Sequence, residues 1–283
     1  MTTSSSPFLV SGISQSTRRM YALVLATTVG MFVMNGLAAS GVISGQSIGG
    51  VSDVNNQIIT PAGYAFSIWG VIYFGLAIFV LLPFIPLRWL RDNELWASLH
   101  SAKVPQAVIL TNALNASWIV VFSFGARSKA ALWLSAVLLL CLVATLMIIL
   151  ERARAWLVVR KTFVHVIALD ATFSLYAGWC TVASIVNVTV ALASTGWTGH
   201  PWTPVGWTLF LLVAATVISL AQTWKRGDGV FGLAVAWALI AIARRNRGVH
   251  DDVAATSYGL AAAAGVAALA SVLMYIFGCS RKA

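Results

Sequence analysis

The amino-acid sequence predicts an all-α integral membrane protein, and we expect eight membrane-spanning helices. Hydrophobic residues make up 59% of the chain and charged residues only 9%, whereas roughly a quarter of the residues in a soluble domain are charged. Backbone N–H and C=O groups find no water inside a bilayer, so only helices or a closed barrel can cross it. The apolar runs are continuous and about twenty residues long, which is typical of helices rather than of barrel strands.

Charged residues bracket the first four spans. Between Arg19 and Asp53, for example, no Asp, Glu, Lys or Arg occurs. A helix of about 20 apolar residues is long enough to cross the hydrocarbon core. The same criterion gives span 1 at residues 20–43, span 2 at about 62–84, span 3 within 103–127 and span 4 within 129–151.

The second half of the chain is expected to hold four more spans. The uncharged stretch between Asp170 and Lys225 is too long for one helix and is broken by two glycines and two prolines at residues 196–204, so it predicts spans 5 and 6. Span 7 is expected at about residues 230–243, which is shorter than the roughly 17–25 residues of most spans. It could be half-inserted, or lengthened by snorkelling of its terminal arginines. Span 8, at about residues 253–277, is rich in Ala and Gly, which predicts close packing inside the bundle or against a second copy.

The distribution of Lys and Arg predicts that both termini are cytoplasmic. With the N-terminus inside, 13 of the 18 basic residues fall on inside segments and five on outside segments, as the positive-inside rule requires. The Ser/Thr-rich residues 1–19 are then a cytoplasmic tail. A cleaved signal peptide is the alternative, but the uncharged run continues well past residue 40, which favours a retained first span.

Composition also excludes several classes of function. The net charge of +10 does not indicate nucleic-acid binding, because the basic residues sit at helix ends, where the topology already accounts for them. An attraction to anionic lipid headgroups is expected instead. The three cysteines show no C-x-x-C spacing, which argues against zinc and structural disulfides. No motif for a phosphate loop, a nucleophile elbow or a zinc protease occurs, so we do not expect an enzyme.

Three polar and aromatic stripes within the spans are the candidate functional residues. Polar or aromatic side chains deep in a span require a partner or a ligand. Their spacing places each stripe on one helix face. Each stripe could instead brace neighbouring helices, but three of similar character predict a shared pocket. The stripes are Phe66, Trp69 and Tyr73 in span 2; Asn112, Asn115, Trp118 and Phe122 in span 3; and Tyr176, Trp179, Ala183 and Asn187 in span 5.

Asp170 is the one acidic residue that could lie inside a span, near the start of span 5. If the helix includes it, its carboxyl group should be paired or protonated. If span 5 starts later, Asp170 lies among the headgroups, which is the interpretation that we favour.

The three stripes resemble motifs of the translocator protein/tryptophan-rich sensory protein family (TspO/MBR). The segment TPAGYAFSIWGVIY at residues 60–73 is similar to the proline pair and W-x-x-x-Y element of that family's second helix. LNASW at residues 114–118, followed by Phe122, is similar to its L-N-x-x-W element. LYAGW at residues 175–179, with Ala183 and Asn187, is similar to its P-Y-x-x-W element, although leucine replaces the proline.

The resemblance covers about residues 20–193 and implies a TspO-like five-helix bundle around a pocket. Three additional helices at residues 194–283 would form a C-terminal extension, and residues 45–60 lack the aromatic loop elements usual in the family. Family members bind tetrapyrroles such as heme and porphyrins, and in some cases sterols. The resemblance therefore implies the following ligand-binding residues: Trp69, Tyr73, Asn115, Trp118, Tyr176, Trp179 and Asn187.

Three functions are consistent with these features. The first is a membrane-embedded binding protein that senses, sequesters or moves a flat hydrophobic ligand, such as a tetrapyrrole or a sterol. The second is a transporter of small solutes, which predicts broken helices near the midplane. The third is an accessory subunit of a larger membrane complex, or a homodimer, joined through span 8.

Overall fold

The computed structural model describes residues 14–85, 93–157 and 166–276, and it confirms the all-α fold class. Eight helices in these ranges are long and apolar enough to cross a membrane, as the charge pattern predicts. The main helices are α1 (Gln15–Ala39), α3 (Ile68–Leu81), α5 (Val104–Ser123), α6 (Lys129–Leu157), α8 (Thr172–Ser194), α9 (Pro204–Arg226), α10 (Gly229–Asn246) and α11 (Asp251–Ile276).

Shorter helices extend or connect the spans. The 3₁₀ helices η1 (Gly63–Ser67) and η2 (Leu82–Phe84) flank α3, and the π-helix η3 (Val166–Ala171) leads into α8. These departures from α geometry lie at span ends. Two short α-helices lie between spans: α2 (Ile48–Val54) follows α1, and α4 (Asn93–Ser101) precedes α5.

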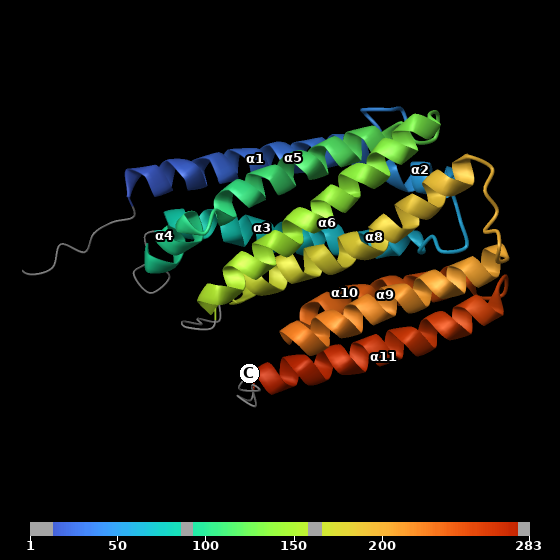
Figure 1. The fold of residues 1–283 in the computed structure, drawn as a ribbon. Helices are drawn as coiled ribbons and strands as arrows, with labels where there is room; N and C mark the ends of the chain where they lie inside the picture. Colours follow the sequence, from blue (N-terminus) through green and yellow to red (C-terminus); the bar gives the residue numbers. More distant parts are fainter. Residues whose placement is uncertain (1–13, 86–92, 158–165, 277–283) are drawn as a thin grey trace, which may run out of the picture.

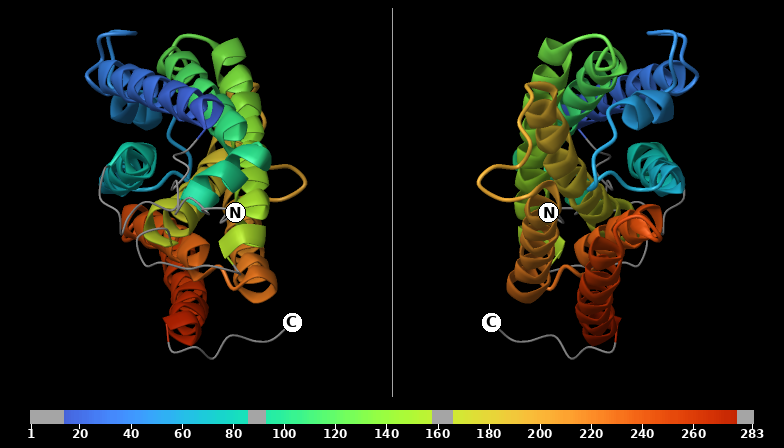
Figure 2. Two further views of the ribbon diagram at one scale, coloured as in Figure 1. Left: turned by 90° about the vertical axis from the view of Figure 1, so that its left-hand side faces the viewer. Right: turned by 90° about the vertical axis from the view of Figure 1, so that its right-hand side faces the viewer.

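The first five spans form a closed ring of packed helices. Helix α1 contacts α3 and α5, α5 contacts α6, α6 contacts α8, and α8 returns to α3. The two end-on views show these helices grouped on one side of the molecule (Figure 2). The seven candidate residues lie on three helices of this ring, α3, α5 and α8, so the ring brings the three stripes into one interior.

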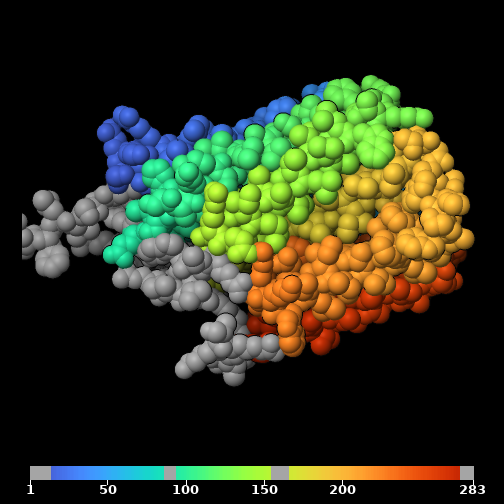
Figure 3. Space-filling view, viewed as in Figure 1, coloured from blue at the N-terminus to red at the C-terminus, as the bar shows by residue number. Residues whose placement is uncertain are grey.

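The last three spans form a second group that packs against α8. Helix α10 contacts α8, α9 and α11, and it is the most buried of the eight spans. Figure 1 shows α9, α10 and α11 side by side along the ring, and the space-filling view shows their atoms packed against it (Figure 3). Span 7, which the sequence predicts to be short, corresponds to α10 and is therefore the interior helix of this group.

Small residues allow this close packing. A Cβ added at Gly178 of α8 would lie 2.6 Å from the carbonyl oxygen of Phe231 in α10, and one added at Gly229 would overlap the carbonyl of Ala268 in α11. Three alanines of α11 that face its neighbours, Ala261, Ala264 and Ala268, are buried. One face of the Ala/Gly-rich span 8 therefore packs inside the bundle, whereas Gly259, Ala262, Ala263 and Ala270 are exposed, so packing of α11 against a second copy stays a prediction.

Local sequence signals set several helix ends. The side chains of Ser14 and Thr203 cap the starts of α1 and α9, as a hydroxyl at an N-cap commonly does. Gly227, with φ of +67°, ends α9, and Asp228 caps α10 two residues after α9 ends. Helix α10 runs three residues beyond the expected residue 243 and so includes Arg245 and Asn246.

The start of α1 and the end of α11 lie at the same end of the bundle, the end that carries α4 (Figure 1). Helix α2 lies at the opposite end, which we call the α2 end. Which end faces the cytoplasm stays a prediction from the Lys and Arg distribution. The expected domain boundary at residue 193 falls at the end of α8, in front of the loop to α9.

Candidate ligand-binding site

The three aromatic stripes converge on Trp69. Its ring is stacked on Tyr73 at 5.5 Å between ring centroids, and it lies 5.9 Å from Trp118. Tyr176 and Trp179 meet it edge-on at 5.6 and 6.3 Å. Aromatic pairs at such separations stabilise each other beyond simple burial, so five of the seven candidate residues form one cluster.

A small cavity of about 50 Å³ lies on the side of this cluster that faces the α2 end. Its wall is formed by the faces of α3, α5 and α8 and by residues of α2 and the segment after it. The lining residues are Ile48, Ser52, Pro61, Phe66, Trp69, Trp118, Phe122, Trp179, Val182, Ala183, Val186 and Asn187.

Three polar atoms of the cavity-lining residues are unpartnered donors. Within the described part of the chain, the indole N–H groups of Trp118 and Trp179 and the Nδ2 amide of Asn187 are buried without a hydrogen-bond partner. The three residues are 4%, 3% and 6% exposed. A buried donor without a partner costs roughly 1–3 kcal/mol, and most native proteins satisfy such groups. All three donors belong to residues that line one apolar cavity, so rotation of these side chains would turn the donors toward a hydrogen-bond acceptor bound there.

The other three candidate residues lie behind Trp69 and do not line the cavity. Asn115 accepts a hydrogen bond from Asn35 Nδ2 at 2.7 Å and donates from its own Nδ2 to the Tyr176 hydroxyl, also at 2.7 Å. This chain of contacts joins α1, α5 and α8. Tyr73 packs between Trp69 and Phe32. Asn115 and Tyr176 therefore brace the helices that carry the site.

Asn112, from the same stripe as Asn115, is also a brace. Its Nδ2 donates to Thr28 at 2.9 Å and to Thr27 at 3.1 Å, which joins α5 to α1. Of the two amides in span 3, neither reaches the cavity, whereas the amide of Asn187 in span 5 does. Sequence spacing alone could not separate these roles.

Several lining residues are absent from the sequence-based set. Val182 and Val186 follow Trp179 at helical spacing on α8, so the spacing of that stripe could have identified them. Ile48 and Ser52 of α2 carry no such signal. Residues 45–60 have no apolar periodicity that separates them from an ordinary loop, yet they fold into a helix capped by Ser47, whose hydroxyl accepts from Gly50 N.

Asp170 lies within η3, in the first turns of span 5, and is half-buried. Helical structure already includes residues 166–171, so the helix starts before Asp170 and not after it, while the placement of Asp170 among the headgroups stays a prediction. The π-helical turn reaches further toward the α4 end than the hydrophobic run alone predicts. Nearby, Ser174 donates to Asp228 at 2.7 Å and so links α8 to the start of α10.

No metal-binding constellation accompanies the cavity. Within residues 14–85, 93–157 and 166–276, no group of three His, Cys, Asp or Glu side chains lies close enough to hold a metal ion. The residues that line the cavity offer aromatic rings, the Ser52 hydroxyl and the Asn187 amide.

Comparison with known proteins identifies the family. No curated protein and no solved structure matches this chain. A family model described as "TSPO-like protein" matches residues 21–272. The matched range includes α9, α10 and nearly all of α11, and thus extends beyond the first five spans that carry the motif resemblance. The chain, an integral membrane protein built on an eight-span helical bundle, belongs to the family of TSPO-like proteins.

Proposed function

We propose that this protein binds a flat, largely apolar ligand that carries hydrogen-bond acceptors, in the cavity between α3, α5 and α8. The observation that carries the proposal is that three residues that line one aromatic cavity, Trp118, Trp179 and Asn187, each carry a buried donor without a partner. A planar ligand would stack against the indole rings. Its acceptor atoms would satisfy the donors, whose lack of partners otherwise destabilises the protein.

Tetrapyrroles and sterols are the ligand classes that we propose to test first. Both are flat and apolar, and both carry oxygen or nitrogen acceptors at their edges. Neither fits the cavity as it stands, because about 50 Å³ is far below the roughly 300–1,000 Å³ of typical ligand pockets. Binding therefore requires that part of the wall move, and we derive no ligand geometry from the cavity in its present size.

Binding, rather than catalysis, is the proposed activity. Indole and amide N–H groups orient a ligand but are neither general bases nor nucleophiles at neutral pH. The biological role would be sensing, sequestration or movement of the ligand. The transporter alternative predicts helix breaks near the midplane. The described spans depart from α geometry at their ends, so no observation favours that alternative.

The test is to remove single N–H groups while keeping the aromatic wall. We expect Trp118→Phe, Trp179→Phe and Asn187→Leu each to weaken binding about 3- to 10-fold, since a neutral hydrogen bond contributes about 0.5–1.5 kcal/mol. Binding of protoporphyrin IX and heme is measured from their absorbance, and binding of a radiolabelled sterol by equilibrium dialysis in detergent.

The matched control is Ser257→Ala, which also removes a buried unpartnered hydrogen-bonding group, but one on α11 that lines neither this cavity nor its neighbour. It should leave affinity unchanged. The double variant Trp69→Ala/Trp179→Ala, which removes most of the aromatic wall, should abolish saturable binding in a protein that remains folded. Affinities unchanged in all of the cavity variants would contradict the assignment of this cavity.

A further inference from the structure

The wall of the cavity at the α2 end is a separate segment of chain. Residues 48–62, which we call the lid, comprise α2 and the extended stretch that leads into η1. Ile48, Ser52 and Pro61 of the lid face the aromatic cavity. The remaining lining residues lie on α3, α5, α8 and η1, which belong to the spans themselves. The lid is therefore the part of the wall that can move without disturbing a membrane-spanning helix.

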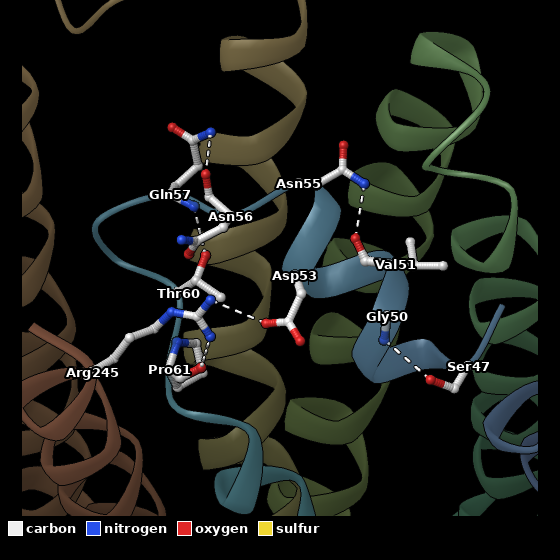
Figure 4. Close-up of polar contacts among 10 residues, drawn as sticks. All are labelled: Ser47, Gly50, Val51, Asp53, Asn55, Asn56, Gln57, Thr60, Pro61 and Arg245. Carbon is white, nitrogen blue, oxygen red and sulfur yellow. Dashed lines mark hydrogen bonds and ion pairs between the residues drawn. The ribbon is translucent and has the colours of Figure 1, made fainter.

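Helix α10 of the C-terminal group contacts the lid through its residues Arg245 and Asn246. Nη2 of Arg245 in α10 lies 3.0 Å from Asp53 Oδ1, and its Nη1 donates to the Pro61 carbonyl at 3.4 Å. Figure 4 shows the Arg245 guanidinium group between these two partners. Nδ2 of the adjacent Asn246 donates to the Ile58 carbonyl at 2.8 Å. Two consecutive residues of α10 thus bind three points of the lid.

The same face of α10 anchors the base of the lid more deeply. Ala62 N donates to the Ala241 carbonyl at 3.1 Å, and Trp237 Nε1 donates to the Ala65 carbonyl at 3.0 Å. Positions 237, 241 and 245 are spaced by four residues and so lie on one helix face. Ala241 and Ala65 are buried, which makes this end a fixed anchor.

The ion pair at Asp53, which we call the tip of the lid, is weaker than the hydrogen bonds at its base around Ala62. The side chains of Arg245 and Asp53 are 25% and 66% exposed. An ion pair in such surroundings contributes little, typically 0–1 kcal/mol, and salt screens it. Ile48 and Val51 of the lid are also buried, and α2 packs against α1 and α5, so the Arg245–Asp53 ion pair is the weakest of the contacts that hold the lid.

The lid borders two cavities. A second cavity of about 190 Å³ lies next to it, lined by Gln57 and Ile58 of the lid and by Thr189, Trp197 and Trp207, among others. Both cavities border successive turns of α8. If the lid were lifted at its tip, the two cavities would join, and their combined volume would approach the lower limit of about 300 Å³ for ligand pockets.

We propose that α10 acts as a latch: Arg245 and Asn246 hold the lid closed over the aromatic cavity, and their release opens a path for the ligand from the second cavity. This proposal rests on the proposed binding function for its purpose, but the movement itself is a property of the protein without ligand. Arg245 and Asn246 are positioning residues that do not line the aromatic cavity. The C-terminal helices thereby control access to a site built by the first five spans.

The experiment measures lid opening directly and without ligand. Val182, 3% exposed on α8 beneath the lid, is replaced by cysteine in a chain whose three native cysteines are removed. The rate of its reaction with a small water-soluble methanethiosulfonate reports access to the cavity. We expect Arg245→Gln and Asn246→Ala each to raise this rate about 3- to 10-fold, and Asp53→Asn, which removes only the exposed ion pair, to raise it by up to about 5-fold. Added KCl should raise the rate with Arg245 present and have little effect in Arg245→Gln.

Two controls separate lid opening from general loosening. Arg244→Gln removes a neighbouring exposed arginine that makes no contact with the lid among the described residues, and should leave the rate unchanged. A chain that retains only Cys180, fully buried on α8 and not part of the cavity wall, should stay unlabelled in every variant.

Equal Val182→Cys labelling rates in the latch variants and the parent would overturn the latch. Loss of the Cys180 protection in those variants would overturn it too, because the change would then be unfolding. If the latch variants open the lid but no tetrapyrrole or sterol binds, the latch stands and the ligand assignment fails.

Discussion

Asn115 and Asn187, the two amides that the family resemblance implies as ligand contacts, should respond to substitution in opposite ways. Asn115→Leu removes two interhelical hydrogen bonds, those with Asn35 and Tyr176. Such bonds in membrane proteins contribute about 0.6 kcal/mol on average and up to about 1.7 kcal/mol. The loss for Asn115→Leu is therefore expected to be about 1–3 kcal/mol in the free energy of unfolding.

Asn187→Leu is expected to leave stability unchanged or to raise it by as much as about 1 kcal/mol. The leucine removes a buried donor that has no partner within the described chain, and such a group carries a desolvation cost of about 1–3 kcal/mol. Part of that gain is offset by the different shape of the leucine side chain. Ligand affinity, in contrast, should fall in Asn187→Leu.

The assay is reversible unfolding in mixed micelles with a rising fraction of denaturing detergent, followed by far-UV circular dichroism. Asn115→Leu should shift the midpoint to lower denaturant at an unchanged slope, with Asn187→Leu at or above the parent. The reasoning is refuted if Asn187→Leu destabilises the protein as much as Asn115→Leu, because Asn187 would then be a structural brace as well.

Two further predictions concern packing and surface charge. Gly178→Val should separate α8 from α10 and cost several kcal/mol of stability, because the added Cβ would lie 2.6 Å from the Phe231 carbonyl oxygen. The control Gly70→Val should be tolerated, because no described atom lies within 4 Å of a Cβ added there. A similar loss of stability in both variants would contradict the close approach of α8 and α10. Glu151→Gln removes the ion pair between Glu151 and Arg226. It should change the free energy of unfolding by less than about 1 kcal/mol, because the Glu151 side chain is 54% exposed and exposed ion pairs contribute little. A larger loss of stability would contradict this reasoning.

The fold could be predicted to a large extent because the membrane restricts the possibilities. Charges are so costly inside the bilayer that their positions alone bracket the spans, and helical periodicity then assigns the faces. This reasoning placed Trp69, Trp118 and Trp179 on three inward faces, and the structure brings the three rings together. The spacing of a stripe identifies the helix face on which its residues lie. It could therefore predict that the three faces meet, but not which side chains line the cavity.

The lid could not be predicted, because it depends on tertiary contacts. Residues 48–59 have neither apolar periodicity nor a recognisable motif. They are held by α10, whose Arg245 lies 192 positions from Asp53 in the sequence. The same limit applies to the amides: the sequence contains Asn115 and Asn187 in similar surroundings, and only the neighbouring side chains decide which one is satisfied.

The short length of α10 has a consequence for how the protein enters the membrane. Its 18 residues, at about 1.5 Å per residue, span about 27 Å, slightly less than the roughly 30 Å hydrocarbon core. Two arginines occupy its last turn. Such a segment partitions poorly into lipid by itself, whereas α9 and α11 on either side are longer. Biogenesis of the C-terminal half should therefore proceed by insertion of α10 together with its neighbours, and a ribosome stalled before α11 emerges should leave α10 outside the bilayer.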